Sequence, residues 1–299
     1  QDNKIKVIST LAGSPAEEAG ITSGDFIISV NGISSNDLGL ANTASKLRGE
    51  SGTKVLIEIS SDSGEIREID LERRSVDLRP VRTKRLRDDS HTIGYLRITQ
   101  FSESVPKKIE EALQELKDKE VEGIILDLRN NSGGLVSSGI AVADSLLSSK
   151  PVVETKDRNG IKDAIISQED TSFDGPMVTL VNKGTASASE ILAGALQDNG
   201  RSTLIGEQTY GKGLIQSLKS LGEESGIAIT VASYLTPNGN NIQGRGITPE
   251  KVLDIPDAVD YGSSEDKWLR NAEIFLGTLL EKNEVLKSEN ELIYEDLQA

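Results

Sequence analysis

The sequence predicts an α/β protein, and two observations support that prediction. Apolar runs of strand length alternate along the chain with segments whose apolar residues recur at helical spacing. Two of the apolar runs, residues 121–128 and 177–181, are almost continuous, which is typical of strands buried on both sides. We therefore expect an α/β core, preceded by a smaller domain that ends near Ser75.

Length and composition are those of a soluble globular protein. The chain has 299 residues, of which 36% are hydrophobic and 27% are charged, and at ~150 residues per domain this length predicts about two domains. No run approaches the roughly 20 apolar residues of a membrane helix, and the start of the chain lacks the pattern of a signal peptide. Because residues 4–9 already alternate as a strand, we expect the chain to begin inside a domain.

Charge and residue types exclude several classes of function. The net charge of −15 argues against a nucleic-acid partner, since such binding needs clustered Lys and Arg. The absence of cysteine excludes disulfides, thiolate zinc sites and cysteine nucleophiles. Because the chain has a single histidine, His91, a histidine-rich metal site is impossible and we expect no metal. His91 falls in a polar stretch and is expected in a solvated loop. A hydrolase of this composition would draw its general base from Lys, Asp or Glu.

One basic cluster interrupts the acidic composition. Its members alternate with less polar residues, so an exposed strand face or a linker explains them, and a docking patch is the alternative. The cluster consists of Arg79, Arg82, Lys84, Arg85 and Arg87.

The first 75 residues are predicted to contain short strands and two helices. Ser14 and Pro15 have the pattern of an N-cap followed by a first helical residue, and Gly20 ends this short helix. A second helix, 38–47, has an apolar face formed by Leu40, Ala41, Ala44 and Leu47. The strands are expected at 4–9, 26–30, 54–59 and 65–71.

After a charged connector at 73–87, strands and helices alternate. Helices are predicted from Ser104 onward, from Gly134 through Leu147, and over 187–198 and 264–283. The strands are expected at 93–98, 121–128, 151–155, 177–181, 203–206, 214–221 and 227–235.

The turn formed by residues 127–134 joins a buried strand to a helix. In an open α/β sheet, ligands gather at the carboxyl ends of strands, and Gly133 and Gly134 let backbone N–H groups face a ligand without an obstructing Cβ. A phosphate-binding loop is one alternative, although neither Gly-Lys-Ser/Thr nor G-x-G-x-x-G is present. A structural Gly-Gly turn is the other.

A second strand-to-helix turn presents Ser187 and Ser189 at a helix start. Either serine would serve as an N-cap, with Glu190 in the first turn favourable to the helix dipole. The functional alternative is an activated serine. The N–H of the next residue, Ala188, would then face a developing oxyanion, and a second N–H from the glycine pair at 133–134 would complete an oxyanion hole.

Lys212 stands between two glycines in an otherwise apolar, strand-like run. A lysine acts as a general base only when it is neutral, and desolvation favours the neutral form. Gln216 is four residues further on, an even offset that places it on the same side of a strand, where its amide oxygen could orient the ammonium. An ordinary surface lysine is the alternative.

Two phrases in the first domain, Ser-Pro-Ala-Glu-Glu-Ala-Gly-Ile and Gly-Asp-Phe-Ile-Ile-Ser-Val-Asn-Gly, resemble a PDZ domain. PDZ domains capture C-terminal peptides by adding them as a strand beside a helix. The resemblance implies a PDZ domain over residues 1–75, truncated at its N-terminus because the family's carboxylate-binding loop would lie before Gln1. It also implies a substrate groove along helix 38–47, with Leu40, Ala44 and Leu47 as substrate-binding residues.

Four later phrases come in a characteristic order: Asp-Leu-Arg-Asn-Asn-Ser-Gly-Gly-Leu, Asn-Lys-Gly-Thr-Ala-Ser-Ala-Ser-Glu-Ile-Leu-Ala-Gly-Ala-Leu-Gln-Asp-Asn-Gly-Arg, Gly-Lys-Gly-Leu-Ile-Gln and Tyr-Leu-Thr-Pro-Asn-Gly. Together with the PDZ phrases they resemble the C-terminal processing peptidases, or tail-specific proteases, over roughly Ile5–Pro256. The resemblance implies a crotonase-like protease core at 76–256 and a C-terminal helical tail at 257–299.

The same resemblance implies the roles of individual residues. Ser187 would be the nucleophile, Lys212 the general base and Gln216 the orienting partner of that base. Ala188 and one glycine of the pair Gly133–Gly134 would form the oxyanion hole.

The resemblance further implies a serine endopeptidase with a Ser/Lys dyad and no cofactor. Family members cut exported proteins near their C-termini, in the periplasm, at the cell surface or in the thylakoid lumen. Its partners would be protein or peptide substrates with apolar C-termini, some of them membrane-associated, which the PDZ domain recognises or gates. A photosynthetic member would process the precursor of a photosystem II reaction-centre protein. The sequence makes no prediction of oligomeric state.

The chain departs from the family pattern in one late motif. Members commonly carry Arg after Pro-Ser-Gly, and residues 237–240 here read Pro-Asn-Gly-Asn. Two other classes of function stay open. One is a binding module, in which the PDZ domain recruits partners and the core is an inactive scaffold. The other is a crotonase-like acyl-CoA enzyme, since that fold also uses N–H oxyanion holes.

Overall fold

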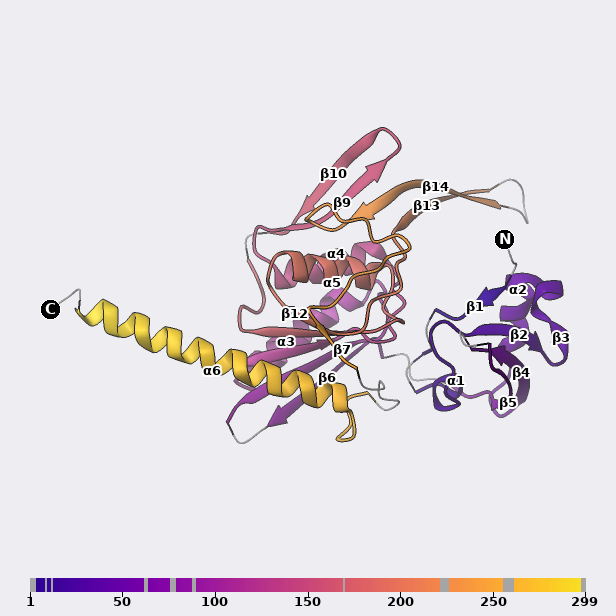
Figure 1. Ribbon diagram of the computed structural model, residues 1–299, viewed down its shortest axis with the longest axis horizontal. Helices are drawn as coiled ribbons and strands as arrows, with labels where there is room; N and C mark the ends of the chain where they lie inside the picture. The colour runs from indigo at the N-terminus through magenta and orange to yellow at the C-terminus, as the bar shows by residue number, and fades with distance from the viewer. Residues whose placement is uncertain are drawn as a thin grey trace.

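The computed structural model describes residues 4–8, 10–11, 13–61, 64–75, 79–87, 90–168, 170–220, 226–254 and 261–296. The chain forms a small N-terminal domain and a larger α/β core, and a long C-terminal helix packs on that core with its first part and extends beyond it (Figure 1). Within these residues, no helix has both the length and the apolar content needed to cross a bilayer.

The N-terminal domain is a small sheet with two helices. Alternation along one central strand, β4, turns Val55, Ile57 and Ile59 inward, where they form the core of the domain. The side chain of Ser14 caps the first helix, as predicted, by accepting a hydrogen bond from the N–H of Glu17 (3.2 Å). The elements are β1 (Ile5–Lys6), α1 (Pro15–Glu18), β2 (Phe26–Val30), β3 (Ile33–Ser34), α2 (Ser35–Leu47), β4 (Lys54–Ser60) and β5 (Ile66–Glu72).

Helix α2 does not present the single apolar face that its sequence predicts. Gly39 has φ 70° and interrupts the helical conformation, so residues before and after it do not share one helical phase. All four residues of the predicted face follow Gly39, yet Leu40 is 71% exposed and the buried residue of this stretch is Thr43. Ala44 and Leu47 are half-buried, and only Leu47 of the three predicted groove residues lines the cavity of about 470 Å³ in this domain.

The core is built on a six-stranded sheet in the order β15-β12-β11-β8-β7-β6. Neighbouring strands run parallel except for β6, which pairs antiparallel with β7 at one edge. The strands are β6 (Val81–Arg87), β7 (Thr92–Ile98), β8 (Gly123–Asp127), β11 (Met177–Val181), β12 (Thr203–Gly206) and β15 (Lys251–Val252).

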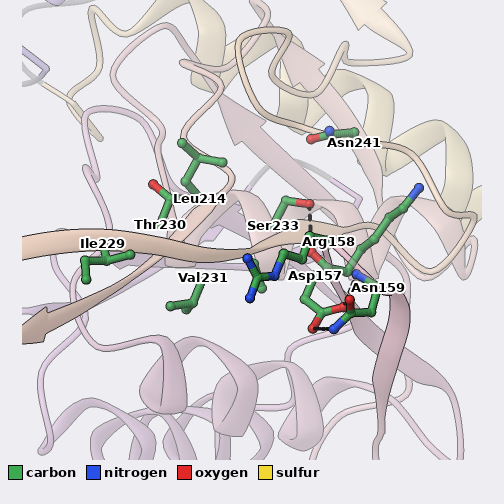
Figure 2. Close-up of a pocket in the computed structure, with 11 residues that line it drawn as sticks. Asp157, Arg158, Asn159, Leu214, Ile229, Thr230, Val231, Ser233 and Asn241 are labelled. Carbon is green, nitrogen blue, oxygen red and sulfur yellow. Dashed lines mark hydrogen bonds between the residues drawn. The ribbon is translucent and has the colours of Figure 1, made fainter.

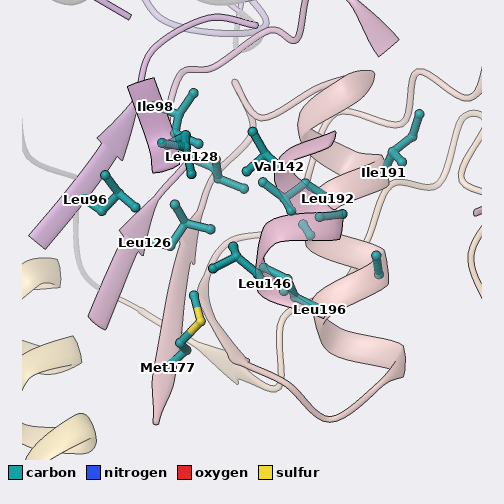
Figure 3. Close-up of a cluster of buried hydrophobic side chains, with 14 of the residues drawn as sticks. Leu96, Ile98, Leu126, Leu128, Val142, Leu146, Met177, Ile191, Leu192 and Leu196 are labelled. Carbon is teal, nitrogen blue, oxygen red and sulfur yellow. The ribbon is translucent and has the colours of Figure 1, made fainter. Parts of the chain in front are cut away.

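Helices cover both faces of this sheet, and this explains its continuous apolar strands. On one face, Leu126 and Met177 pack with α3 (Val105–Asp118), α4 (Val136–Leu146) and α5 (Ala188–Asp198), as Figure 3 shows for α4 and α5. The alternate residues of the same strands turn to the other face, against α6 (Lys267–Asp296). The residues buried between this face and α6 include Ile125, Val178 and Leu180 of the sheet, and Trp268, Leu269, Ala272, Leu276 and Leu280 of α6.

A second, four-stranded sheet adjoins the core in the order β10-β9-β14-β13. Its two central strands pair over Lys156–Glu154 and Ser233–Leu235, and the β13–β14 ribbon projects from the body of the molecule (Figure 1). The strands are β9 (Pro151–Asp157), β10 (Gly160–Ile166), β13 (Leu214–Ser220) and β14 (Gly226–Leu235).

The two-residue strands β3 and β15 were not predicted, and three larger differences from the predicted elements have a physical reason. Residues 81–87, assigned to a connector, form β6 because β7 offers them a free edge to pair with. Strand β10 was missed because its sequence has no sustained alternation, and its hairpin with β9 supplies the pairing instead. Helix α6 continues to Asp296, beyond the predicted end at residue 283.

Candidate active site

Three loops meet at one edge of the core sheet. The strands β8, β11 and β12 are adjacent and parallel, so their carboxyl ends lie side by side, and ligand sites of open α/β sheets form at this edge. Backbone hydrogen bonds join the loops: the N–H of Ala186 donates to Asn131 O (3.0 Å), and the N–H of Tyr210 donates to Thr185 O (3.0 Å). The loops comprise residues 128–135, 182–187 and 207–213.

Ser187 is the residue immediately before α5, and its backbone conformation is unusual. Its φ of 58° and ψ of −117° are rarely adopted by a residue with a side chain. A strained strand-to-helix turn of this kind exposes the nucleophilic serine of α/β-hydrolases. Ser187 is partly exposed, whereas Ser189 is fully buried and donates its hydroxyl to Asn131 O (2.9 Å). Of the two candidate serines, Ser187 is therefore the one that a substrate can reach.

The glycine pair lies directly against this turn. A Cβ on Gly133 would lie 2.9 Å from Ser187 Cβ and 3.0 Å from Ala188 N, and the φ angles of Gly133 and Gly134 are 98° and 138°. The N–H of Gly133 already donates to Asn131 Oδ1 (2.9 Å). Within the described chain, no hydrogen bond is found for the N–H of Ala188 or of Gly134. Of the two glycines, Gly134 is thus the one whose N–H has no partner within the described residues.

Glu190 connects the serine turn to the lysine loop. Its carboxylate is fully buried and accepts four hydrogen bonds. Oε2 accepts from the N–H groups of Ser187 (2.8 Å) and Lys212 (2.8 Å). Oε1 accepts from the hydroxyl of Thr209 (2.6 Å) and the N–H of Gly211 (2.7 Å). The sequence predicted for Glu190 only a favourable interaction with the helix dipole, although a serine followed three residues later by Glu is the pattern of a side chain that reaches back to a backbone N–H.

Lys212 reaches the site through its backbone, and its side chain is exposed. The two flanking glycines permit close packing, since a Cβ on Gly211 would lie 2.8 Å from Gly246 N and one on Gly213 would also meet the neighbouring loop. Among the described residues, no hydrogen bond joins Lys212 Nζ to Ser187 Oγ.

Gln216 lies on β13 and its side chain is exposed. Lys212, Leu214 and Gln216 are exposed, whereas Gly213 is buried and Ile215 is half-buried, an alternation that agrees with the predicted even offset. No hydrogen bond between Gln216 and Lys212 is found in the described residues.

A buried ionic network anchors the start of the loop at 128–135. Asp127 accepts hydrogen bonds from Arg129 Nη2 (2.7 Å), Arg97 Nη1 (2.9 Å) and the Tyr95 hydroxyl (2.6 Å), all in the interior. Burial alone would raise the pKa of Asp127, but the two guanidinium groups and these hydrogen bonds hold it well below its ordinary range. Burial raises the pKa of Tyr95 and the adjacent Asp127 charge raises it further, so the phenol stays protonated and donates.

An open cavity of about 740 Å³ lies between the β9–β10 turn and strand β14 (Figure 2). Apolar side chains of Leu214, Ile229 and Val231 line one part of it, and the polar turn at 157–159 lines another. None of the predicted catalytic side chains is part of its lining, and Leu214 is the lining residue nearest in sequence to Lys212.

His91 is buried, contrary to the solvated loop position predicted for it. Its Nδ1 lies 3.0 Å from Glu122 Oε2. With Glu284 of α6, these residues place three potential ligand atoms within 4.8 Å of one another, the one such group within the described residues. They lie at the amino ends of β7 and β8, at the opposite edge of the sheet from Ser187.

The chain matches the models of two protein families. The model for peptidase family S41 matches residues 92–253, more than half of the chain. The chain belongs to peptidase family S41. A PDZ domain matches residues 7–60. The predicted family and its arrangement of a PDZ domain before an α/β protease core are therefore confirmed.

Relatives of this S41 chain carry the same name as the predicted family. A carboxyl-terminal-processing protease of Synechocystis sp. is 45% identical over 260 residues, covering 86% of this chain and 60% of the relative. The carboxy-terminal processing protease CtpA of Bacillus subtilis is 37% identical over 258 residues, covering 86% of this chain and 55% of the relative. The chain thus spans 60% or less of the length of these two relatives.

A solved structure has a similar fold. It is titled photosystem II D1 C-terminal processing protease, and it matches with a TM-score of 0.77 and 35% sequence identity, covering 85% of this chain and 69% of that one.

Proposed function

We propose that this S41 chain is a serine endopeptidase that cleaves protein substrates near their C-termini by means of a Ser187–Lys212 dyad. The observation that carries the proposal is the buried carboxylate of Glu190, which binds the backbone N–H of both residues through one oxygen atom. A nucleophile and a base must keep a fixed relation if a proton is to pass between them. Glu190 ties the two backbones together without occupying either reactive side chain.

In the proposed reaction, neutral Lys212 removes the proton from Ser187 Oγ, which attacks the carbonyl carbon of the scissile bond. The carbonyl oxygen becomes an oxyanion and is stabilised by the N–H groups of Ala188 and Gly134. The protonated lysine then donates its proton to the leaving amine, and an acyl-enzyme remains. Water, deprotonated by Lys212, attacks the acyl carbon and releases the new C-terminus. Lys212 is exposed here, so we propose that bound substrate covers its ammonium and favours the neutral form.

We propose that Gln216 orients Lys212 in the substrate complex. Both side chains are exposed, and the alternating burial over 212–216 supports their placement on the same side of the chain.

We also propose that the PDZ domain recognises the substrate's apolar C-terminus and gates the site. One contact supports this coupling: the hydroxyl of Ser23 in the N-terminal domain donates to Lys183 O (2.9 Å) in the serine turn. Leu47, which lines the cavity of this domain, is the predicted groove residue best placed to contact such a substrate. Leu40 is exposed and Ala44 is half-buried, and neither lines that cavity.

The proposed division of the chain is a PDZ domain at 1–75, a protease core at 76–256 and a helical tail at 257–299. We propose exported substrates, in the periplasm, at the cell surface or in the thylakoid lumen, as the family implies. The similarity to a protease titled for photosystem II D1 processing supports membrane-associated proteins as one substrate class.

Cleavage of an unstructured polypeptide with an apolar free C-terminus tests the proposal. We expect Ser187→Ala and Lys212→Ala each to lower turnover by about a thousandfold or more, while Ser132→Ala and Lys183→Ala, at exposed positions in the same loops, keep it. Retained cleavage by Ser187→Ala would rule out the nucleophile. Equal cleavage by Lys212→Ala and the wild type would assign the base elsewhere, and an inactive wild type would favour the binding module.

A further inference from the structure

The residue before the C-terminal helix is hydrogen-bonded to the loop that contains Gly133 and Gly134. Asp266, one residue before α6, is fully buried. Its two oxygens accept from two nitrogens of Arg129, Nη1 to Oδ1 (3.0 Å) and Nη2 to Oδ2 (2.6 Å). The same carboxylate accepts the N–H groups of Gly262 (2.9 Å) and Leu269 (3.0 Å). The Asp266 carboxylate therefore caps α6 and forms a bidentate ion pair with Arg129.

Tyr261 makes a second connection between the same two segments. The Arg97 and Arg129 guanidinium groups lie 4.2 Å and 4.4 Å from the centre of its ring, within the range of a cation–π interaction. Its hydroxyl oxygen accepts a hydrogen bond from Asn130 Nδ2 (2.9 Å). Two consecutive loop residues, Arg129 and Asn130, are thus held by the segment that precedes α6.

From these two residues the loop leads directly to the reactive groups. The N–H of Asn130 donates to Asn182 Oδ1 (2.9 Å), at the start of the serine turn. The backbone O of Asn131 accepts the N–H of Ala186 (3.0 Å), and its side chain accepts the N–H of Gly133. Gly134 follows, with the N–H assigned above to the oxyanion. A displacement at Arg129 would therefore move an oxyanion donor, and donors of this kind act only within a few tenths of an ångström of the right place.

We propose that Asp266, together with Tyr261, is a positioning residue for catalysis: seating of α6 on the sheet sets the geometry of the oxyanion loop through Arg129. This inference rests on the proposed function. It assigns a role in turnover to a segment that follows the residues matched to the protease family, which end at 253. A merely stabilising ion pair would instead affect turnover only through the amount of folded protein.

The first experiment compares Asp266→Asn with the wild type and with Glu265→Gln. Asparagine keeps the size of the side chain and is a good N-cap, but it removes the charge and one of the two acceptors for Arg129. Glu265 is the exposed neighbour of Asp266, so its substitution removes a nearby charge without touching Arg129. We expect Asp266→Asn to lower kcat about tenfold or more with KM changed less than about threefold, and Glu265→Gln to change neither.

The fraction of folded protein is measured in the same samples. Trp268 is the single tryptophan of the chain and lies 5.9 Å from the Arg129 guanidinium, so its emission reports on this junction and on global unfolding. After correction for the folded fraction, a kcat equal to that of the wild type would overturn the proposal.

The second experiment does not depend on activity. Hydrogen–deuterium exchange is measured on peptides that cover residues 129–135. We expect faster exchange in Asp266→Asn and unchanged exchange in Glu265→Gln, because the hydrogen bond of the Gly133 N–H depends on a fixed Asn131. Unchanged exchange in Asp266→Asn would overturn the positioning role even if the wild type failed to cleave any substrate. Cleavage retained by Ser187→Ala would instead remove the proposed function and leave the exchange result to decide the positioning role.

Discussion

Gly133 lies against Ser187, the proposed nucleophile, at a position where a side chain is disfavoured. Its φ of 98° disfavours any L-residue, and a Cβ would press on Ser187 and on Ala188 N. The first effect is backbone strain, which a side chain would cause at any glycine with a positive φ. The second effect, the contact with Ser187 and Ala188, is specific to this site.

We expect Gly133→Ala to lower kcat by about a hundredfold or more, because the shifted loop displaces an oxyanion donor. Gly200→Ala is the matched control: its φ is 63° and a Cβ there meets nothing within 4 Å, so only strain is added. Both variants should lose about 1–3 kcal/mol of unfolding free energy, measured by urea denaturation. Equal activity in the two variants would show that the contact with Ser187 is unimportant.

The lowered pKa of Asp127 predicts how the free energy of unfolding depends on pH. Its folded-state pKa is held below the ordinary value of about 4 by Arg129 and Arg97 against the opposing effect of burial. Its ionised form therefore stabilises the fold above the unfolded pKa, and this contribution is lost as the pH falls through the folded pKa. We expect the unfolding free energy to decline steeply below about pH 4.

The measurement is urea unfolding between pH 3 and 7 for the wild type and Asp127→Asn. The variant should be less stable at pH 7 by about 3–5 kcal/mol, because two buried guanidinium groups lose a partner, and its stability should depend less on pH. A wild type whose stability is constant down to pH 3 would contradict this account. If the variant does not fold, the wild-type curve alone decides.

At the scale of elements, Glu190 couples helix α5 to the loop before β13. Each of its oxygens accepts two hydrogen bonds. Glu190→Gln replaces one of these oxygens by an NH2 group, so two of the four donors lose their acceptor. Each unsatisfied buried donor costs about 1–3 kcal/mol.

We expect Glu190→Gln to reduce both unfolding free energy and kcat, and Glu207→Gln, at a partly exposed position with no comparable set of bonds among the described residues, to spare kcat. Steady-state kinetics and thermal unfolding on the same preparations provide the test. A variant with a lower melting temperature but a normal kcat per folded molecule would mean that Glu190 stabilises the loops without aligning them.

Helix α1 carries a carboxylate that is less stable in its ionised form. Burial raises the pKa of Glu17, and the hydrogen bond from the Gly13 N–H, which lowers it, has a smaller effect. A raised folded-state pKa favours the protonated group, so its stabilising contribution is present below the unfolded pKa and is lost as the pH rises through the folded pKa.

Glu17→Gln should therefore raise the melting temperature at pH 7 and change it little at pH 4. Scanning calorimetry at the two pH values measures this. Glu18→Gln, which removes the exposed neighbouring carboxylate, should not reproduce the effect, and a lower melting temperature at pH 7 for Glu17→Gln would show that the hydrogen bond to Gly13 outweighs burial.

At the scale of the whole molecule, the core sheet requires helices on both faces. Helix α6 covers one of them with Trp268, Leu269, Leu276 and Leu280. Each large buried side chain contributes about 1.5–3 kcal/mol, so together they are comparable with the stability of an entire domain.

We expect a chain that ends at residue 260 to be insoluble or unfolded, and a chain that ends at residue 285, which retains these four side chains, to fold. Circular dichroism and gel filtration of the two shortened proteins provide the comparison. A soluble, cooperatively unfolding chain ending at 260 would show that the sheet needs no cover on this face.

Much of this fold could be predicted from the sequence because its signals are local. The runs at 121–128 and 177–181 contain both alternating sets of apolar residues, so their burial on two faces follows from composition alone. The cap at Ser14 and the helix after Ser187 likewise depend on residues three or four positions apart. The phrases around Ser187 and Lys212 were also sufficient to predict the family that the comparisons confirmed.

The rest required the tertiary structure because it depends on which distant segments become neighbours. The order of strands β8, β11 and β12 decides that the glycine, serine and lysine loops meet, and the resulting contacts distinguish Ser187 from Ser189 and Gly134 from Gly133. The burial of His91 and the grip of Asp266 on Arg129 depend on α6 returning to the sheet, across a separation that no periodicity encodes. The sequence by itself thus determined most of the elements and the family, since local spacing controls burial, while only the fold decided the hydrogen-bond partners that position the proposed reactive groups.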